Sequence, residues 1–454
     1  MLLAITNFNV VISVIGGWLV LVGVFSHLLS DALYISEAFV SLVGGVTFTH
    51  IAKLFKPADY VVSEDAVASV TLDLSRLVLG VSLVLEGIRL PSRYLRTEWK
   101  TLALLLGPGM AGMWACSSAV IWLLVPGLPV LHALAVAACI TPTDPVLSGA
   151  IVKGRFAEDN VPEALRRVIV AESGANDGLG YPFLFIALYL IKYAAEGSNA
   201  EGDAFTALRF FFGQTCLYVV LMSVAYGAVV GLAAQKLLAW AERRRYVARE
   251  NFLLFPVGLA IFIIGTCGAV GSDDVLACFI AGNAFTWNDW FRVKTLDDPL
   301  QPALETLLNL GVFMWFGAVC PWGSFVSTEG LIHPVRLFAL GALLLLLRRI
   351  PTILGLHSFI PQIQGRQNAM FVGFFGPIGV SAIFYLYVGL EFLDSMASDE
   401  GEREDMKQLG DIMMVVIWFL VICSIVVHGL SVPLAKLGSH LLDVFRRRRI
   451  TLPT

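Results

Sequence analysis

The feature that most constrains this chain is a series of apolar stretches, each long enough to cross a bilayer, that recurs along almost its entire length. A membrane helix needs about 20 mostly apolar residues. The 454 residues are 57% hydrophobic and only 15% charged, whereas soluble domains carry about 25% charged residues. This composition excludes a soluble enzyme, a disordered chain and a nucleic-acid-binding protein, whose binding surface would be basic. We therefore predict an all-α membrane protein with many spans.

We predict about thirteen membrane helices from these apolar stretches. Arginine and lysine collect in cytosolic loops, and here they follow the odd-numbered spans, for example Lys153, Arg155 and the arginines at 243–245. The loop 196–206 has neither residue type. The pattern predicts an outside N-terminus, a cytosolic C-terminus and a short basic cytosolic tail at 438–454. The predicted spans lie near 9–29, 33–52, 68–90, 101–125, 130–152, 164–192, 207–239, 251–270, 274–291, 303–322, 335–357, 367–393 and 409–437.

Two of these spans are interrupted by helix-breaking residues. The span 130–152 contains Thr-Pro-Thr-Asp-Pro at 141–145, and the span 367–393 contains Gly-Phe-Phe-Gly-Pro-Ile-Gly at 373–379. Proline frees a backbone carbonyl, and exposed backbone persists inside a membrane only where it lines a cavity or is buried in protein. If the seventh span links two six-helix halves, each break is fifth in its half. Although one break could be a simple kink, matched breaks indicate a transporter with inverted repeats and two crossing discontinuous helices.

A carboxylate lies where the chain is otherwise apolar. Asp177 precedes a long apolar run, and Ser173 lies one helical turn before it. Charge at the bilayer centre costs roughly 2.5–3.5 kcal/mol, so such a residue indicates function. A small hard cation prefers oxygen ligands, which Asp177, Ser173, Thr143 and the freed carbonyls of the first break could supply. A buried carboxylate also binds a proton readily, so proton and cation would compete for it. A structural aspartate that accepts backbone hydrogen bonds is the alternative.

These residues belong to motifs of a known family. Thr-Pro-Thr-Asp-Pro at 141–145, followed by Glu-Ser-Gly-Ala-Asn-Asp at 172–177, resembles the monovalent cation/proton antiporter-1 family. The segments 272–283, which begins Ser-Asp-Asp, and 348–351, Arg-Arg-Ile-Pro, are similar to its fungal-type plasma-membrane sodium/proton antiporters. The resemblance implies the antiporter fold and a homodimer in the plasma membrane. It also implies a core domain at 68–192 and 303–437 and a dimerisation domain at 9–52 and 207–291.

The resemblance also implies roles for the cation site. Asp177 matches the aspartate that exchanges cation and proton, Asn176 matches its neutral neighbour, and Thr143 and Ser173 match cation ligands. The three ligands for sodium would be Asp177, Ser173 and Thr143. Members with an Asn-Asp pair are mostly electroneutral, but fungal relatives are exceptions, so the stoichiometry stays open.

Further matched residues would stabilise the core. Asp144 would compensate helix-end dipoles at the crossing of the broken helices. Arg349 would hold the core together through Asn176 and Glu86, whereas Arg348 would face the membrane interface. Glu86 alternatively is an interfacial glutamate whose carboxylate reaches the headgroups.

Two other groups of polar residues have open roles. Asp273 and Asp274 point about 100° apart on a helix, so they favour a helix N-terminal cap over a paired-carboxylate site. The family resemblance makes a role in the cation path an equal alternative. The histidines are dispersed, which argues against a metal site. His27, His132 and His428 are predicted to be packed or interfacial rather than proton sensors.

The sequence therefore predicts a secondary antiporter that exports sodium or lithium against inward proton flow by alternating access. A potassium(sodium)/proton antiporter of the same fold is the alternative, and a sodium-coupled solute symporter is less favoured because the site is compact and rich in oxygen. A channel would need a continuous pore, and the motifs of intramembrane proteases are absent from the sequence. We expect no cofactor and no nucleic-acid partner, only membrane lipids and a second copy of the chain.

Overall fold

The protein is a bundle of helices in the computed structural model, which describes residues 7–28, 34–57, 64–152, 157, 160–195, 202–296, 298–327, 330–400 and 403–450. No strand occurs in these ranges. Eight helices in them are long and apolar enough to cross a membrane, by length and composition. The all-α membrane fold is therefore confirmed, while the number thirteen stays a prediction. Lys153 and Arg155, used for the orientation, lie outside the described residues.

The helices of the first half follow the predicted spans to within a few residues. The polar motif at 172–177 does not interrupt its helix, which runs without a break. These helices are α1 (Asn7–His27), α2 (Glu37–Val46) with the π-helical turn η2 (Thr47–Ile51), α3 (Glu64–Arg89), α4 (Tyr94–Thr97), α5 (Trp99–Leu104), η4 (Leu105–Gly109), α6 (Met110–Leu124), α7 (Val130–Ile140), α8 (Pro145–Val152) and α10 (Glu163–Ala194).

The second half contains the longest single helix, α21 (Glu404–Ile450), of 47 residues. The predicted span 274–291 is wrong at its end, because the helix stops at Phe285 and a short helix begins at Trp290. The last helix continues through most of the predicted tail. These helices are α11 (Ala204–Phe210), η5 (Phe211–Leu221), α12 (Met222–Arg243), α13 (Arg249–Ala269), α14 (Asp274–Phe285), α15 (Trp290–Thr295), α16 (Leu300–Val319), η6 (Trp322–Phe325), α17 (Pro334–Leu347), α18 (Ile350–Leu356), η7 (His357–Phe359), α19 (Gly365–Phe374), α20 (Val380–Glu400) and α21 (Glu404–Ile450).

Both predicted breaks are present. The first separates α7 from α8 at residues 141–144, and the second separates α19 from α20 at residues 375–379. A third break, which the sequence analysis did not predict, separates α17 from α18 at Arg348 and Arg349. The two arginines thus lie at a turn between two helices rather than inside one span.

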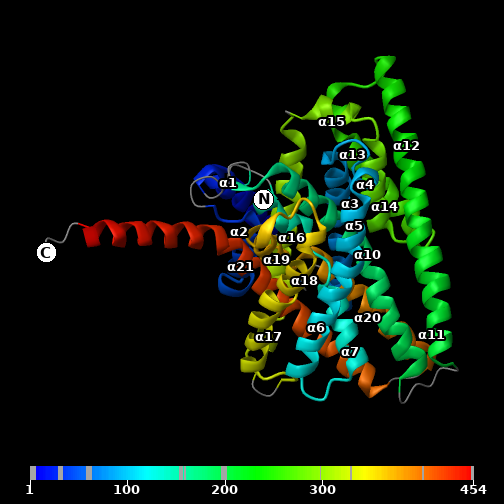
Figure 1. The fold of residues 1–454 in the computed structure, drawn as a ribbon, viewed down its shortest axis with the longest axis vertical. Helices are drawn as coiled ribbons and strands as arrows, with labels where there is room; N and C mark the ends of the chain where they lie inside the picture. The colour runs from blue at the N-terminus through cyan, green and yellow to red at the C-terminus, as the bar shows by residue number, and fades with distance from the viewer. Residues whose placement is uncertain are drawn as a thin grey trace, which may run out of the picture.

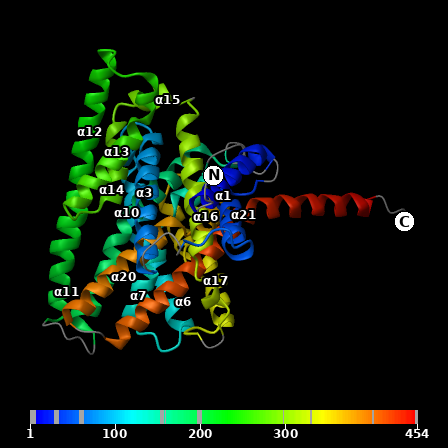
Figure 2. The same ribbon diagram turned by 180° about the vertical axis from the view of Figure 1, so that it is seen from behind.

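The packing brings the broken helices to the centre. α10 packs against α7, α8, α14 and α20, and α21 packs against α7, α8 and α20. Elsewhere α14 packs against α12 and α3, and α16 packs against α2. In Figures 1 and 2, α12 runs along one side of the bundle, and the C-terminal part of α21 projects from the other side.

Candidate ion-binding site

Asp144 lies where the two broken helices cross, and it caps two helices at once. Its Oδ1 accepts hydrogen bonds from the N–H groups of Val146 (2.8 Å) and Leu147 (3.0 Å) at the start of α8. Its Oδ2 accepts from the N–H groups of Val380 and Ser381 (3.3 Å for Ser381) at the start of α20. A carboxylate is favoured at a helix N-terminus, and here one carboxylate serves two N-termini.

Two further contacts fix this crossing. The backbone N–H of Asp144 donates to the carbonyl of Pro377 at 3.0 Å. A side chain at Gly379 would place its Cβ 2.4 Å from Asp144 Oδ2, so only glycine allows this close approach. The glycine-rich motif of the second break therefore has a steric reason at this position.

Arg348 binds the freed carbonyls on the opposite side of the crossing. Its guanidinium donates to the carbonyls of Ile140, Thr141 (3.3 Å) and Pro142 (3.1 Å) at the end of α7, and to the carbonyl of Gly376 in the second break. Arg348 is only 3% exposed, so the prediction of an interfacial side chain is wrong. We expected the carbonyls of the first break to face a transported cation. They instead accept hydrogen bonds from the buried guanidinium of Arg348.

Three predicted site residues form one connected cluster between the first break and α10. The Thr143 backbone N–H donates to Asn176 Oδ1 at 3.1 Å, and Asn176 Nδ2 donates to Thr143 Oγ1 at 2.9 Å. The Thr143 and Ser173 hydroxyl oxygens are 3.1 Å apart. All three residues are buried. Asn176 therefore fixes Thr143 through both its backbone and its side chain, which places the two hydroxyls side by side.

Asp177 differs from every other member of the site. It is fully buried, and neither carboxylate oxygen has a hydrogen-bond partner among the residues described. Ser173 lies one turn earlier on α10, and the Tyr385 hydroxyl donates to the backbone carbonyl of Asp177, not to its side chain. A buried carboxylate without partners is costly. Such a group is satisfied by a proton or by a bound cation.

Arg349 pairs with a residue to which the sequence analysis gave no role. Its Nη1 and Nη2 each lie 2.7 Å from an oxygen of Glu172, which gives a bidentate ion pair in which both residues are at most 3% exposed. Its Nε donates to the carbonyl of Val372 at 3.0 Å. The predicted partners Asn176 and Glu86 are therefore wrong. Glu172 begins the 172–177 motif, so its place beside the site could have been read from the sequence, but its distant partner could not.

Glu86 lies in a different cluster. Arg89 Nη1 is 3.0 Å from Glu86 Oε1 and 2.7 Å from Glu305 Oε1, so this arginine links α3 to α16. Glu86 is 3% exposed, so it is buried rather than exposed at the interface. The spacing of three residues between Glu86 and Arg89 is the helical signal that predicts this pair.

The Asp273–Asp274 pair begins α14. Asp273 Oδ1 accepts from the Leu276 N–H at 2.9 Å, which confirms the predicted N-terminal cap. Asp274 Oδ2 lies 2.6 Å from Arg76 Nε on α3. Asp273 Oδ2 is buried and has no hydrogen-bond partner within the described part of the chain. The two neighbouring acids therefore differ, since one is neutralised by arginine and the other keeps a free oxygen.

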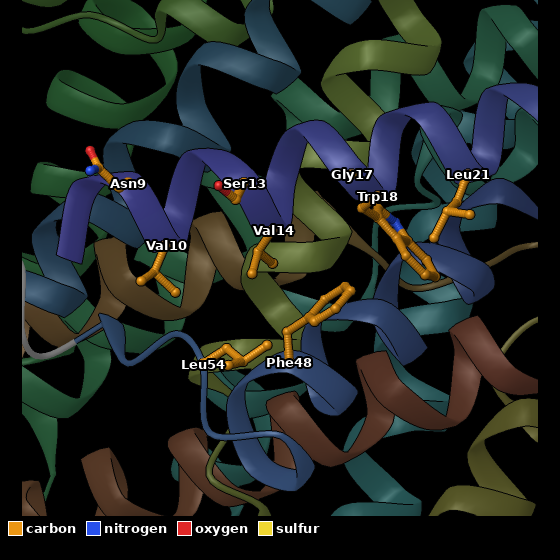
Figure 3. Close-up of a pocket in the computed structure, with 9 residues that line it drawn as sticks. All are labelled: Asn9, Val10, Ser13, Val14, Gly17, Trp18, Leu21, Phe48 and Leu54. Carbon is orange, nitrogen blue, oxygen red and sulfur yellow. The ribbon is translucent and has the colours of Figure 1, made fainter. Parts of the chain in front are cut away.

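An apolar pocket of about 440 Å³ lies away from these residues, between α1 and the segment of η2 and the residues after it that carries Phe48 and Leu54 (Figure 3). The Trp18 ring contacts Phe48 there at a centroid distance of 5.6 Å. None of the predicted site residues lines this pocket. Its lining residues are Asn9, Val10, Ser13, Val14, Gly17, Trp18, Leu21, Phe48 and Leu54.

A helical membrane bundle with two crossing broken helices and buried carboxylates at the crossing defines the class of secondary transporters with inverted repeats. Residues 10–435 match the family described as "Sodium/hydrogen exchanger, transmembrane", and the chain belongs to this family.

Several curated fungal proteins are similar to this chain. A Schizosaccharomyces pombe protein named as a probable Na⁺/H⁺ antiporter is 36% identical over 94% of this chain, and Na⁺/H⁺ antiporter 2 of Zygosaccharomyces rouxii is 34% identical over 97% of it. The chain spans about half the length of these relatives, 56% and 54% respectively. The solved structure of the sodium proton antiporter MjNhaP1 from Methanocaldococcus jannaschii has a TM-score of 0.64 at 17% identity and covers 93% of this chain and 100% of its own, which shows the shared fold.

Proposed function

We propose that this protein exports sodium or lithium in exchange for protons, with both ions competing for Asp177. The observation that carries the proposal is the fully buried Asp177 carboxylate, which has no hydrogen-bond partner within the described residues and lies one turn from Ser173. The Ser173 and Thr143 hydroxyls supply neutral oxygens beside it, as a hard monovalent cation requires. The names of the fungal relatives, all Na⁺/H⁺ antiporters, support the same activity.

Competition at one site is sufficient for exchange when the site faces one side of the membrane at a time. A proton that binds Asp177 displaces the cation. The empty site would leave a buried negative charge, and a site that held both ions would leave a buried positive charge, so both states are unfavourable. Alternating access then couples the two fluxes. The proposed exchange needs no cofactor, because the cycle consists only of the binding, movement and release of the two ions.

The proposed arrangement in the membrane follows from the same inferences. Residues 68–192 and 303–437 form the core domain that carries the site, and residues 9–52 and 207–291 form the domain that contacts a second copy. α3 contacts α20 within the core and α13 and α14 outside it, so it lies where the two domains meet. The N-terminus faces the outside of the plasma membrane and the C-terminus the cytosol.

Asp273 and Asp274 belong to the proposed cation path as a secondary element. α14, which Asp273 caps, packs against α10, which carries Asp177. The free Asp273 oxygen could therefore pass a cation toward Asp177, while Arg76 keeps Asp274 neutralised.

The test is cation-driven proton movement in proteoliposomes that hold a pH gradient. Wild type, Asp177→Asn and the matched surface control Asp203→Asn are compared after pulses of sodium, lithium or potassium. We expect sodium and lithium to dissipate the gradient in wild type and in the control, and not in Asp177→Asn. Dissipation by potassium as well would establish the potassium(sodium)/proton alternative. A folded wild type that is silent with all three cations contradicts the proposal, and an active Asp177→Asn moves the site to Asp273, whose Oδ2 has no hydrogen-bond partner within the described residues.

A further inference from the structure

The unwound segment 375–379 is held from one side by a pair of polar residues on α21. Ser424 and His428 lie one helical turn apart and are 0% and 5% exposed. His428 was expected to be packed or interfacial, and Ser424 had no predicted role. Because membrane interiors offer no water to bare backbone groups, each N–H and C=O of an unwound segment needs a partner. The Ser424–His428 pair supplies two of these partners.

The two contacts lie at opposite ends of the break. Ser424 Oγ accepts a hydrogen bond from the Ile378 backbone N–H at 2.7 Å, just before α20 begins. His428 Nε2 lies 3.0 Å from the carbonyl oxygen of Phe374, the last residue of α19. The rings of Phe374 and Phe375 pack against the imidazole at centroid distances of 5.4 and 6.2 Å. One turn of α21 therefore binds the end of one half-helix and the start of the other.

Chemistry fixes the direction of these hydrogen bonds. A carbonyl oxygen can only accept, so His428 Nε2 must carry a hydrogen to bind Phe374. Nδ1 lies 3.1 Å from Ser424 Oγ and 2.9 Å from the Ser424 backbone carbonyl oxygen. The Ser424 hydroxyl can donate its hydrogen to Nδ1, because its oxygen receives the Ile378 N–H with a lone pair. The neutral imidazole with hydrogen on Nε2 binds Phe374 and accepts from the Ser424 hydroxyl, whereas binding the Ser424 carbonyl as well would require the charged form with hydrogen on both ring nitrogens. A second positive charge would be costly here, since the guanidinium of Arg348 binds Gly376 in the same segment.

We propose that the Ser424–His428 pair is a positioning element of the ion site, in which neutral His428 sets the place of the second broken helix. It acts through the segment that it holds. The N–H groups of Val380 and Ser381 follow this segment directly and bind Asp144. A shift of residues 374–378 therefore moves the donors of Asp144 and, through the crossing, the cluster beside Asp177. The effect on transport rests on the proposed function, while the effect on the segment does not.

The first test is amide hydrogen exchange of the intact protein, which needs no transport. In His428→Ala, we expect the amides of residues 376–381 to exchange about tenfold faster, the scale of one lost hydrogen bond. His428→Gln keeps a neutral N–H donor of similar reach and is expected to restore most of the protection. Ser431→Ala is the matched control on α21, since its hydroxyl binds only the His428 carbonyl. Protection in His428→Ala equal to that of wild type would overturn the proposal.

The second test is the kinetics of sodium-driven proton movement. For His428→Ala we expect the apparent KM for sodium to rise about tenfold and the pH of half-maximal exchange to move, with both restored in His428→Gln. A purely structural role would lower the amount of active protein and hence the maximal rate, with KM and pH profile unchanged, and that result would contradict positioning. If wild type itself moves no protons, the proposed function fails, and hydrogen exchange still decides whether the pair holds the segment.

Discussion

Asp144 and Asp177 are both fully buried aspartates near the crossing of the broken helices, yet their surroundings are opposite. Asp144 accepts four backbone hydrogen bonds, two from α8 and two from α20. Asp177 accepts none from the residues that the structure describes. The residue types and the exposure of the two carboxylates are the same. What differs is the number of donors that face each one.

This difference separates a structural charge from a functional one. Four N–H donors at two helix N-termini stabilise a permanent negative charge at Asp144, and they leave no free position for a cation. Asp177 gains no such stabilisation, so its burial lowers the stability of the empty protein. A buried charged residue that lowers stability and has no compensating contact is expected to be retained because it binds an ion. Asp144 therefore supports the crossing, and Asp177 is the better candidate for the exchanged ions.

The largest expected effect comes from removing the two carboxylates in turn. Asp144→Ala leaves four buried N–H groups without partners, at about 1–3 kcal/mol each, so we expect little folded protein. Asp177→Asn removes an uncompensated buried charge and is expected to melt at or above the wild-type temperature. Thermal unfolding in detergent, followed by size-exclusion chromatography, measures both. Equal destabilisation by the two substitutions would remove the distinction between them.

The ion pair of Glu172 and Arg349 gives the next largest effect. Unlike Asp177, Glu172 is a buried carboxylate whose charge is paired with an arginine. Glu172→Gln leaves the guanidinium unpaired, which costs about 3–5 kcal/mol for a buried pair. The double variant Glu172→Leu/Arg349→Met should be more stable than Glu172→Gln, because it removes both charges. A double variant less stable than the single one would show that Arg349 acts mainly through its Val372 contact.

A structural feature could be predicted from the sequence when the groups that form it lie close together in the chain. The breaks at 141–145 and 373–379 were predictable because proline and glycine act on their own backbone. The Asp273 cap was predictable too, since its partner is three residues away. The fold class followed from the apolar spans, and the cluster of Thr143, Ser173 and Asn176 followed from the family resemblance.

Long-range partners were not predictable from one sequence. Arg349 binds Glu172 across 177 positions, and Arg348 binds carbonyls more than 200 positions away. Either arginine could have been interfacial by sequence, because the break that turns both inward has only Pro351 as a local signal. The local pair of Glu86 with Arg89 could have been predicted from its spacing. The family resemblance, however, suggested Arg349 as the partner of Glu86.

A smaller effect is expected from the hydroxyls beside Asp177. Ser173→Ala and Thr143→Ala each remove one neutral oxygen from the proposed sodium site and should raise the apparent KM for sodium about tenfold, the scale of one hydrogen bond or ligand contact. Thr143→Ser keeps the hydroxyl and is the matched control. Transport assays over a sodium series measure the change. An unchanged KM in both alanine variants would leave Asp177 without these ligands and weaken its contrast with Asp144.

The smallest effect concerns Asp203, which caps a helix as Asp144 does, but at an exposed position outside the spans. Its Oδ1 accepts from the Thr206 N–H at 2.9 Å and from the Thr206 hydroxyl at 3.0 Å. The Thr206 backbone N–H, and then its hydroxyl, hold the pKa of Asp203 below its usual value. A carboxylate whose pKa is lowered by folding stabilises the helix above its unfolded pKa, about 4. The contribution is lost as pH falls through the lower, folded value.

The protection of amides at the start of α11, relative to their intrinsic exchange rates, is therefore expected to fall below about pH 4 in wild type. Asparagine caps helices as well as aspartate does and does not titrate, so Asp203→Asn should keep the protection and lose this dependence on pH. The same dependence in Asp203→Asn would assign it to another group. When the exposed Asp203 cap is lost, water can bind the freed N–H groups, so the effect stays local to α11. When the buried Asp144 cap is lost, no water is available to replace it, and the N-termini of two helices are affected.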